Sequence, residues 1–205
     1  AIPRTERLRG DGLDLHVTIS GTGPPVILLH GFPEASHCWH HQLPALAAAG
    51  YSAWAVNMRG YPPSDIPRAR RELALPHLVA DVAAVARATG HPKVHLVGHD
   101  WGGIIAWAFA GAHADVLDRL VVLNAPHMEV FRDKLWRSGQ FLRSGYVALF
   151  QLPWLPERML SAGGFRLLRQ MFLASQHKHA YTSGDLDRYA ASLAQRGALR
   201  AALDY

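Results

Sequence analysis

The sequence is poor in cysteine, in charged residues and in long apolar runs. Its one cysteine, Cys38, cannot form an intramolecular disulfide, which is typical of a reducing compartment and predicts a cytoplasmic location. The most apolar stretches, such as 26–29, fall far short of the roughly 18 residues that a membrane span requires. The N-terminus also has no apolar signal core. These absences exclude a disulfide scaffold and predict no membrane partner.

Metal-binding and nucleic-acid-binding patterns are missing as well. No cluster of cysteine and histidine has the spacing of a zinc site, so we expect neither a metal nor another cofactor. Nearly all of the 21 basic residues are arginines spread along the chain, with one short cluster at Arg68, Arg70 and Arg71. The net charge of +5 therefore does not form the basic patch of a nucleic-acid-binding protein.

What the chain does have is an apolar content of 49% in 205 residues, enough for one packed globular domain. Short apolar runs alternate with helical patterns. This order predicts an α/β fold with a mostly parallel sheet that is covered by helices on both faces. The predicted strands are 13–20, 26–29, 51–56, 94–97 and 120–123, and the predicted helices are 40–49, 73–89 and 101–113.

The second predicted helix carries an apolar stripe of the kind that packs on a sheet. The stripe consists of Leu75, Leu78, Val79, Val82 and Val85. The β-rich runs stop near Pro126, and the remainder has the composition of helix and loop. We therefore expect an α/β core over residues 1–125 and a helical part over 126–205.

The strongest chemical signal is Gly98-His99-Asp100-Trp101-Gly102-Gly103, which follows the predicted strand 94–97. A strand that ends in Gly-x-nucleophile-x-Gly and passes directly into a helix forms a nucleophile elbow. The glycines leave room for the strained turn. Asp100 stands where esterases and lipases carry serine, so the predicted nucleophile is a carboxylate.

An oxyanion hole is the second element of such a site. It combines the backbone N–H after the nucleophile with one from the loop after an earlier strand. Trp101 follows the nucleophile, and Phe32 lies in the segment His30-Gly31-Phe32-Pro33 after the predicted strand 26–29. Because both motifs occur at strand ends, together they predict a hydrolase site.

These motifs resemble those of epoxide hydrolases, which have the α/β-hydrolase fold. The resemblance implies a helical cap over 126–205 and a small hydrophobic epoxide as substrate. It extends over nearly the whole chain, through His30–Glu34, Arg59–Tyr61, Gly98–Gly103, Asn124–His127 and Phe150–Glu157.

The resemblance implies a reaction in two steps. Asp100 attacks an epoxide carbon and forms an alkyl-enzyme ester, while Tyr146 of the cap binds and protonates the opening oxygen. The ester is then hydrolysed to a diol, and the N–H groups of Phe32 and Trp101 stabilise the oxyanion. Phe32, Trp101 and Tyr146 are also expected to line an apolar substrate pocket.

Several alternatives stay open. Haloalkane dehalogenases share the elbow but usually carry Asn at the position of Phe32, and fluoroacetate dehalogenases usually carry Arg at the position of Trp101. A chain that only binds a hydrophobic ligand or a partner, without catalysis, is a third possibility. Tyr146 itself has the alternative of packing against its aromatic neighbours Phe141 and Phe150.

The C-terminal segment differs most from the family pattern. Residues 197–205 resemble the end of the cap, so the family's second catalytic tyrosine would fall one position beyond Tyr205. The resemblance therefore implies that this chain lacks the acid and the histidine of the catalytic triad. It also predicts that strand 120–123 forms an exposed apolar sheet edge. Smaller departures are Asn57, where the family usually has Asp, and Pro62-Pro63.

Histidines within the chain offer a poor substitute for the missing base. His30 and His99 belong to the two predicted loops, and His177 and His179 to a polar part of the cap. His127, after the last predicted strand, is the one remaining candidate.

Overall fold

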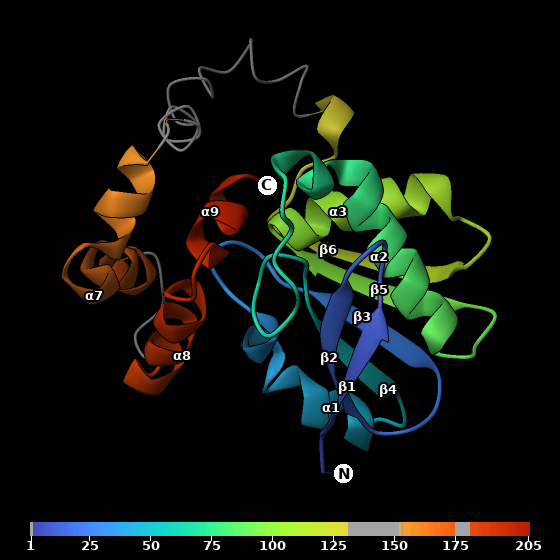
Figure 1. The fold of residues 1–205 in the computed structure, drawn as a ribbon. Helices are drawn as coiled ribbons and strands as arrows, with labels where there is room; N and C mark the ends of the chain where they lie inside the picture. Colours follow the sequence, from blue (N-terminus) through green and yellow to red (C-terminus); the bar gives the residue numbers. More distant parts are fainter. Residues whose placement is uncertain (1, 131–151, 153, 175–180) are drawn as a thin grey trace.

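The fold is organised around a six-stranded mixed sheet with the strand order β1-β2-β4-β3-β5-β6 (Figure 1). The computed structural model describes residues 2–130, 152, 154–174 and 181–205. The strands are β1 (Arg4–Arg9), β2 (Asp14–Ser20), β3 (Pro25–Leu29), β4 (Ser52–Asn57), β5 (Val94–His99) and β6 (Leu117–Leu123).

Strands β3, β4, β5 and β6 are parallel, as the alternation of strands and helices predicts. All five residues of β3 are buried, because this strand lies at the centre of the sheet. The sequence analysis missed β1, which pairs antiparallel with β2 at the sheet edge. Five of its six side chains are polar and most are exposed, so the strand lacks an apolar face that a pattern search would find.

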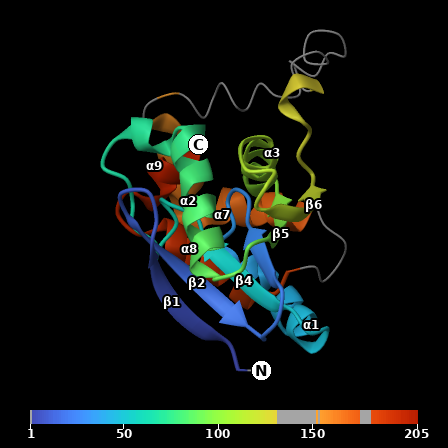
Figure 2. The same cartoon turned by 90° about the vertical axis from the view of Figure 1, so that its right-hand side faces the viewer.

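Helices cover the sheet on both faces (Figures 1 and 2). Ile27 and Leu29 of β3 belong to the larger apolar cluster, which includes α2 and α3. Val26 and Leu28 point the opposite way, into a smaller cluster with α1. The elements on these faces are η1 (Ser36–Trp39), α1 (Gln42–Ala48), η2 (Arg70–Leu73), α2 (Leu75–Ala88) and α3 (Trp101–Ala112).

The predicted apolar stripe of α2 is largely confirmed. Leu78, Val79, Val82 and Val85 are buried in the larger apolar cluster. Leu75 is an exception, because it is the first residue of the helix and is 37% exposed. The packed face of α2 therefore begins one turn later than the sequence pattern indicates.

Strand β6 forms the outer strand of the described sheet. Val121 is 49% exposed and Leu123 is 42% exposed, so the prediction of an apolar sheet edge is confirmed for the residues that the structure describes. By contrast, all residues of β3, which lies on the other side of β5, are buried.

Among its described residues, the C-terminal part contains the helices α7 (Leu155–Ala174), α8 (Ser183–Leu193) and α9 (Ala198–Leu203) and no strand. We call the described residues 154–174 and 181–205 the helical segment. Helix α7 is kinked at 162–165, where three successive residues have positive φ angles. The segment lies beside the core in Figure 1, and buried residues such as Leu168 and Leu186 join the larger apolar cluster. Within the described ranges, no helix is long and apolar enough to cross a bilayer.

Candidate active site

Asp100 occupies the sharp turn between β5 and α3, as the sequence predicts. Its backbone angles are φ 53° and ψ −119°, a conformation that a non-glycine residue rarely adopts. The turn is held from both sides, because the Asp100 N–H donates to Leu123 O at 3.0 Å and the Gly103 N–H donates to Asp100 O at 2.9 Å. Strained backbone of this kind recurs at functional sites.

Gly98 and Gly102 make this turn possible. A Cβ on Gly102 would lie 2.5 Å from Leu29 O and 2.6 Å from His30 O. A Cβ on Gly98 would collide with the backbone carbonyl of Gly102. Both glycines therefore permit a close approach of β3, β5 and the start of α3 that no other residue allows.

The Asp100 carboxylate faces the loop after β3. The Phe32 N–H donates a hydrogen bond of 3.0 Å to Asp100 Oδ1. Gly31 is required for this contact, since a Cβ there would lie 2.5 Å from Asp100 Cβ. Trp101 is the first residue of α3, where an N–H has no acceptor within the helix. The structure thus brings Phe32 and Asp100 together, with Trp101 adjacent.

His30 fixes the loop that carries Phe32. Its Nδ1 donates to Gly31 O at 3.0 Å, and its Nε2 accepts from the Met58 N–H at 3.1 Å. Burial lowers the pKa of His30 to about 4, so the ring is neutral near pH 7. Tyr61 packs edge-on against the ring at a centroid distance of 4.5 Å. His30 is therefore a structural residue whose two nitrogens are both committed to the backbone.

A buried carboxylate, Glu34, joins this loop to the elbow and to the helical segment. Its Oε2 accepts from His99 Nδ1 at 3.1 Å, and its Oε1 accepts from the Tyr181 hydroxyl at 2.7 Å. The Nε2 of His99 accepts from Asn124 Nδ2 at 3.4 Å. These contacts link residues that are far apart in sequence around the residue preceding Asp100.

The two titratable partners in this cluster shift each other's pKa in opposite directions. Burial alone would raise the pKa of Glu34, but hydrogen bonds from His99 and Tyr181 outweigh it and keep that pKa below its usual value. The hydrogen bond to Glu34 raises the pKa of His99. A carboxylate–imidazolium pair therefore forms next to the elbow over a mildly acidic pH range.

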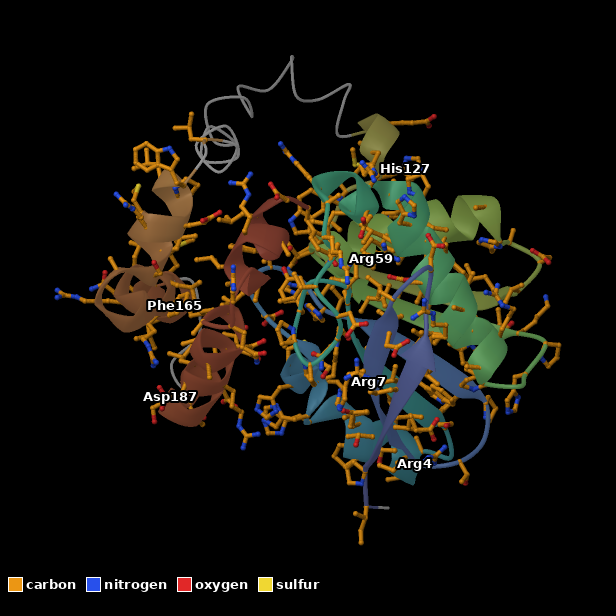
Figure 3. All side chains as sticks on the ribbon, viewed as in Figure 1. Arg4, Arg7, Arg59, His127, Phe165 and Asp187 are labelled. Carbon is orange, nitrogen blue, oxygen red and sulfur yellow. The ribbon has the colours of Figure 1, made fainter. Side chains whose placement is uncertain are left out.

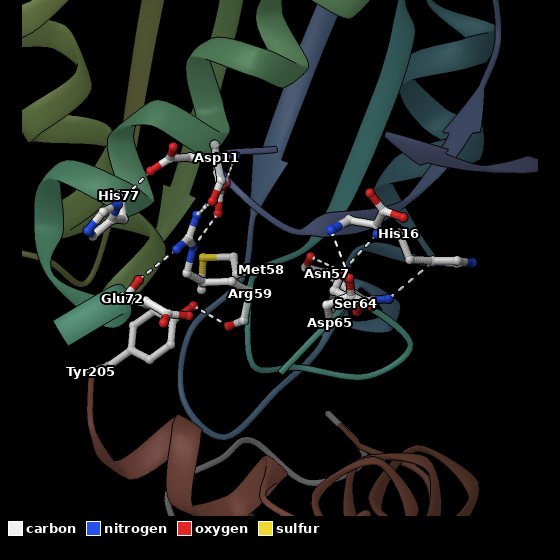
Figure 4. Close-up of polar contacts among 12 residues, drawn as sticks. Asp11, His16, Asn57, Met58, Arg59, Ser64, Asp65, Glu72, His77 and Tyr205 are labelled. Atoms are coloured by element: carbon white, nitrogen blue, oxygen red, sulfur yellow. Dashed lines mark hydrogen bonds and ion pairs between the residues drawn. The ribbon is translucent and has the colours of Figure 1, made fainter. Parts of the chain in front are cut away.

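A second buried network, centred on Arg59, connects the loop after β4 to α2 and to the C-terminal residue Tyr205 (Figure 4). The Arg59 guanidinium donates to both carboxylate oxygens of Asp81, at 2.6 and 2.7 Å. Its remaining N–H groups reach the backbone carbonyls of Glu72 and Asp11. The Tyr205 hydroxyl donates to Arg59 O at 2.7 Å, so the end of α9 is attached to the same network.

Other predicted residues lie elsewhere. Tyr146 falls outside the described residues, together with His177 and His179. His127 is exposed and packs edge-on against Trp107 at 5.2 Å, near the end of β6 (Figure 3). One cavity lies in the core beside α2, and another lies between α7 and α9. Neither is lined by Asp100, and the apolar pocket beside Asp100 stays a prediction.

A histidine cluster also lies between the core and the helical segment. His37 Nε2 contacts Asp185 Oδ1 at 2.8 Å, and the His40 ring stacks on the His37 ring at 4.4 Å. No metal site is expected from the sequence, since no cysteine–histidine cluster has zinc-site spacing, and the contact of His37 with Asp185 joins residues 148 positions apart. The contact of Tyr181 with Glu34 could not be predicted either, because the two residues are 147 positions apart. Glu34 itself could have been proposed as a site residue, because it directly follows the oxyanion motif.

Comparison with known proteins identifies the fold family. Residues 24–193 match the family model described as alpha/beta hydrolase fold. The chain belongs to this family. Among curated relatives of this α/β hydrolase, "Epoxide hydrolase 4" of Homo sapiens is 34% identical over 97% of this chain and 57% of its own length. "AB hydrolase superfamily protein YfhM" of Bacillus subtilis is 35% identical over 95% of this chain and 69% of its own length.

Solved structures lead to the same family. An epoxide hydrolase from Bacillus megaterium superposes with a TM-score of 0.89 at 28% identity, covering 98% of this chain and 70% of that one. An epoxide hydrolase from Vigna radiata has a TM-score of 0.85 at 27% identity, covering 99% and 70%. The predicted α/β-hydrolase fold and the resemblance to epoxide hydrolases are thus confirmed. This α/β hydrolase spans little more than half the length of the first of these curated relatives.

Proposed function

We propose that this α/β hydrolase carries the nucleophilic step of epoxide hydrolysis, with Asp100 as the nucleophile. The observation that supports this best is the hydrogen bond of 3.0 Å from the Phe32 N–H to Asp100 Oδ1. It orients the carboxylate and leaves Oδ2 to attack. Relatives named epoxide hydrolases, at about a third identity over almost the whole chain, support the substrate class.

In the first step, Asp100 Oδ2 attacks an epoxide carbon and the carbon–oxygen bond of the ring breaks. The ring oxygen takes a proton from the Tyr146 hydroxyl, which gives a hydroxyalkyl ester of Asp100. We assign residues 126–205 to a cap over the core, from which Tyr146 would act on the ring oxygen. Tyr181 and Asp185 support this assignment through their contacts with Glu34 and His37.

In the second step, water adds to the carbonyl carbon of the ester. The N–H groups of Phe32 and Trp101 stabilise the negative charge on Oδ1. The Cγ–Oδ2 bond then breaks, and the diol leaves with the former Oδ2, which takes up the proton removed from the water. A general base must take the proton from the attacking water. His30 is committed to the backbone and His99 to Glu34 and Asn124. We therefore expect the ester to accumulate in the 205-residue chain.

Mass spectrometry of the intact chain after incubation with styrene oxide tests this proposal. The expected result is one adduct with the mass of the epoxide, which peptide mapping assigns to Asp100. Asp100→Asn should abolish the adduct, because an amide is a far weaker nucleophile. Asp115→Asn, which changes an exposed carboxylate after α3, should leave adduct formation unchanged. Tyr146→Phe should slow it.

Three outcomes would contradict parts of the proposal. A folded protein without an adduct would remove Asp100 as the nucleophile. Many turnovers to diol would mean that a base within residues 1–205 activates water, with His127 as the candidate. Release of halide from a haloalkane, without reaction with the epoxide, would favour a dehalogenase.

A further inference from the structure

His37, His40 and Asp185 form the one group of three potential metal ligands among the described residues. One ligand atom of each side chain lies within 4.8 Å of the others. His37 belongs to η1 and His40 follows it directly, whereas Asp185 lies in the first turn of α8. The group therefore connects the core to the helical segment and includes no residue of the proposed reaction.

The two histidines share one side of a short 3₁₀ helix. Positions i and i+3 of such a helix lie above one another, and the His37 and His40 rings stack with an interplanar angle of 7°. His40 Nδ1 donates to His37 O at 2.9 Å. Because Nδ1 carries the proton, Nε2 keeps its lone pair. A backbone carbonyl that fixes the tautomer in this way is typical of metal-binding histidines.

The carboxylate of Asp185 is held just as firmly. Its Oδ2 accepts from the Thr182 N–H at 2.9 Å and from the Thr182 hydroxyl at 2.6 Å. Its Oδ1 therefore points at His37 Nε2, 2.8 Å away. Thr182 thus occupies one carboxylate oxygen of Asp185 and leaves the other, Oδ1, directed at the two histidines as a ligand.

The surroundings suit an ion that enters from solvent. The His37 side chain is 25% exposed and that of Asp185 is 12% exposed. Both are thus partly removed from water, which strengthens their attraction for a cation. Tyr189 closes one side, with its ring 6.3 Å from that of His37.

We propose that His37, His40 and Asp185 bind a divalent transition-metal ion such as Zn²⁺, which links η1 to the start of α8. Ligand atoms about 2.1 Å from a tetrahedral zinc ion lie roughly 3.4 Å apart, so His37 Nε2 and Asp185 Oδ1, now 2.8 Å apart, must separate by about half an ångström to bind it. The ion replaces the proton that the two share. Two imidazole ligands favour Zn²⁺, Ni²⁺ or Cu²⁺ over Mg²⁺ and Ca²⁺, which require oxygen ligands.

The test is calorimetric titration of the 205-residue chain with zinc chloride after removal of metals with a chelator. We expect one equivalent to bind with a low-micromolar Kd or tighter, and zinc to raise the melting temperature. Mg²⁺ should have no effect. His40→Gln should weaken zinc binding by more than about tenfold, as should Asp185→Asn.

His77→Gln is the matched control. His77 also contacts a carboxylate, that of Asp11 at 2.5 Å, and the pair is not part of a three-ligand group among the described residues. This variant should bind zinc like the parent. His40→Gln leaves the Thr182–Asp185 cap intact, so it keeps the test informative if Asp185→Asn fails to fold.

Two results would overturn the proposal. The first is the absence of saturable binding up to about 1 mM zinc, a concentration well above that expected for a three-ligand site. The second is an unchanged Kd in folded His40→Gln, which would mean that zinc binds to other histidines.

Discussion

The core and the helical segment are held in place by different kinds of interaction. In the core, the elbow around Asp100 is built by backbone hydrogen bonds within a parallel sheet and by glycines that allow close approach. The helical segment shares the larger apolar cluster but reaches the core through polar side chains as well. Examples are Tyr181 with Glu34, Asp185 with His37 and Asp204 with Arg70.

The two kinds of interaction respond differently to pH and to metal ions. Backbone hydrogen bonds in a sheet do not titrate, so the backbone turn at Asp100 is itself insensitive to mild changes of pH, although the Glu34–His99 pair beside it does titrate. Carboxylate and imidazole contacts change with protonation and with metal ions. We therefore expect the attachment of the helical segment to vary more readily than the elbow. The experiments below test this contrast, beginning with the largest effect.

Asp81→Asn should produce the greatest loss, because it leaves the buried Arg59 charge without its partner. The Arg59 side chain is 1% exposed and that of Asp81 is 8% exposed. We expect the free energy of unfolding to fall by about 3–5 kcal/mol, measured by urea denaturation at pH 7. The exposed pair of Arg4 and Glu6 provides the control, and Glu6→Gln should cost less than about 1 kcal/mol. Equal losses would show that burial does not decide the contribution.

Gly102→Ala tests the close approach at the elbow. The new Cβ would meet two backbone carbonyl oxygens, so the strands must shift, and we expect a loss of about 1–3 kcal/mol. Gly111→Ala is the matched control in the same helix, since beyond its chain neighbours and its own helix backbone no atom of the described residues lies within 4 Å of its Cβ position. That change should be neutral or stabilising by up to about 1 kcal/mol. If both variants unfold at the same urea concentration, the glycine argument is wrong.

Tyr181→Phe should loosen the helical segment without weakening the core. It removes a hydrogen bond of 2.7 Å to the Glu34 carboxylate, a loss of about 1.5 kcal/mol. Hydrogen exchange should become faster for the amides of α8 and stay unchanged in β3. Tyr51→Phe, at a tyrosine that packs against His95, should change neither. Equally faster exchange in β3 would contradict the contrast between the two regions.

The pH dependence of Glu34 and His99 should be the smallest effect. Because the pKa of Glu34 is lower in the folded chain than its ordinary value of 4.5, Glu34 contributes stability above pH 4.5, and this stability is lost as pH falls through the folded pKa. Because the pKa of His99 is raised above its ordinary value of 6.5, His99 contributes stability below pH 6.5, and this stability is lost as pH rises through the folded pKa. The stability difference between the parent and Glu34→Gln should therefore be greatest between these two values. Urea titrations from pH 4 to 8 measure it, and a difference independent of pH would refute the pairing.

Much of the core could be predicted from local patterns. The strands β2 to β6 and the helices α1 to α3 lie within a few residues of their predicted bounds, because the apolar periodicity reflects one or two buried faces. The edge strand β1 and the exposure of Leu75 could not be predicted, since both depend on how far the sheet extends beside them.

The sequence alone determined the fold family and the elbow, because a glycine-flanked Asp100 after a buried strand allows few other conformations. Only the tertiary structure decided which distant side chains meet. Glu34 with Tyr181, and His37 with Asp185, are separated by 147 and 148 positions. No local pattern encodes such pairs, because the path of the whole chain brings them together.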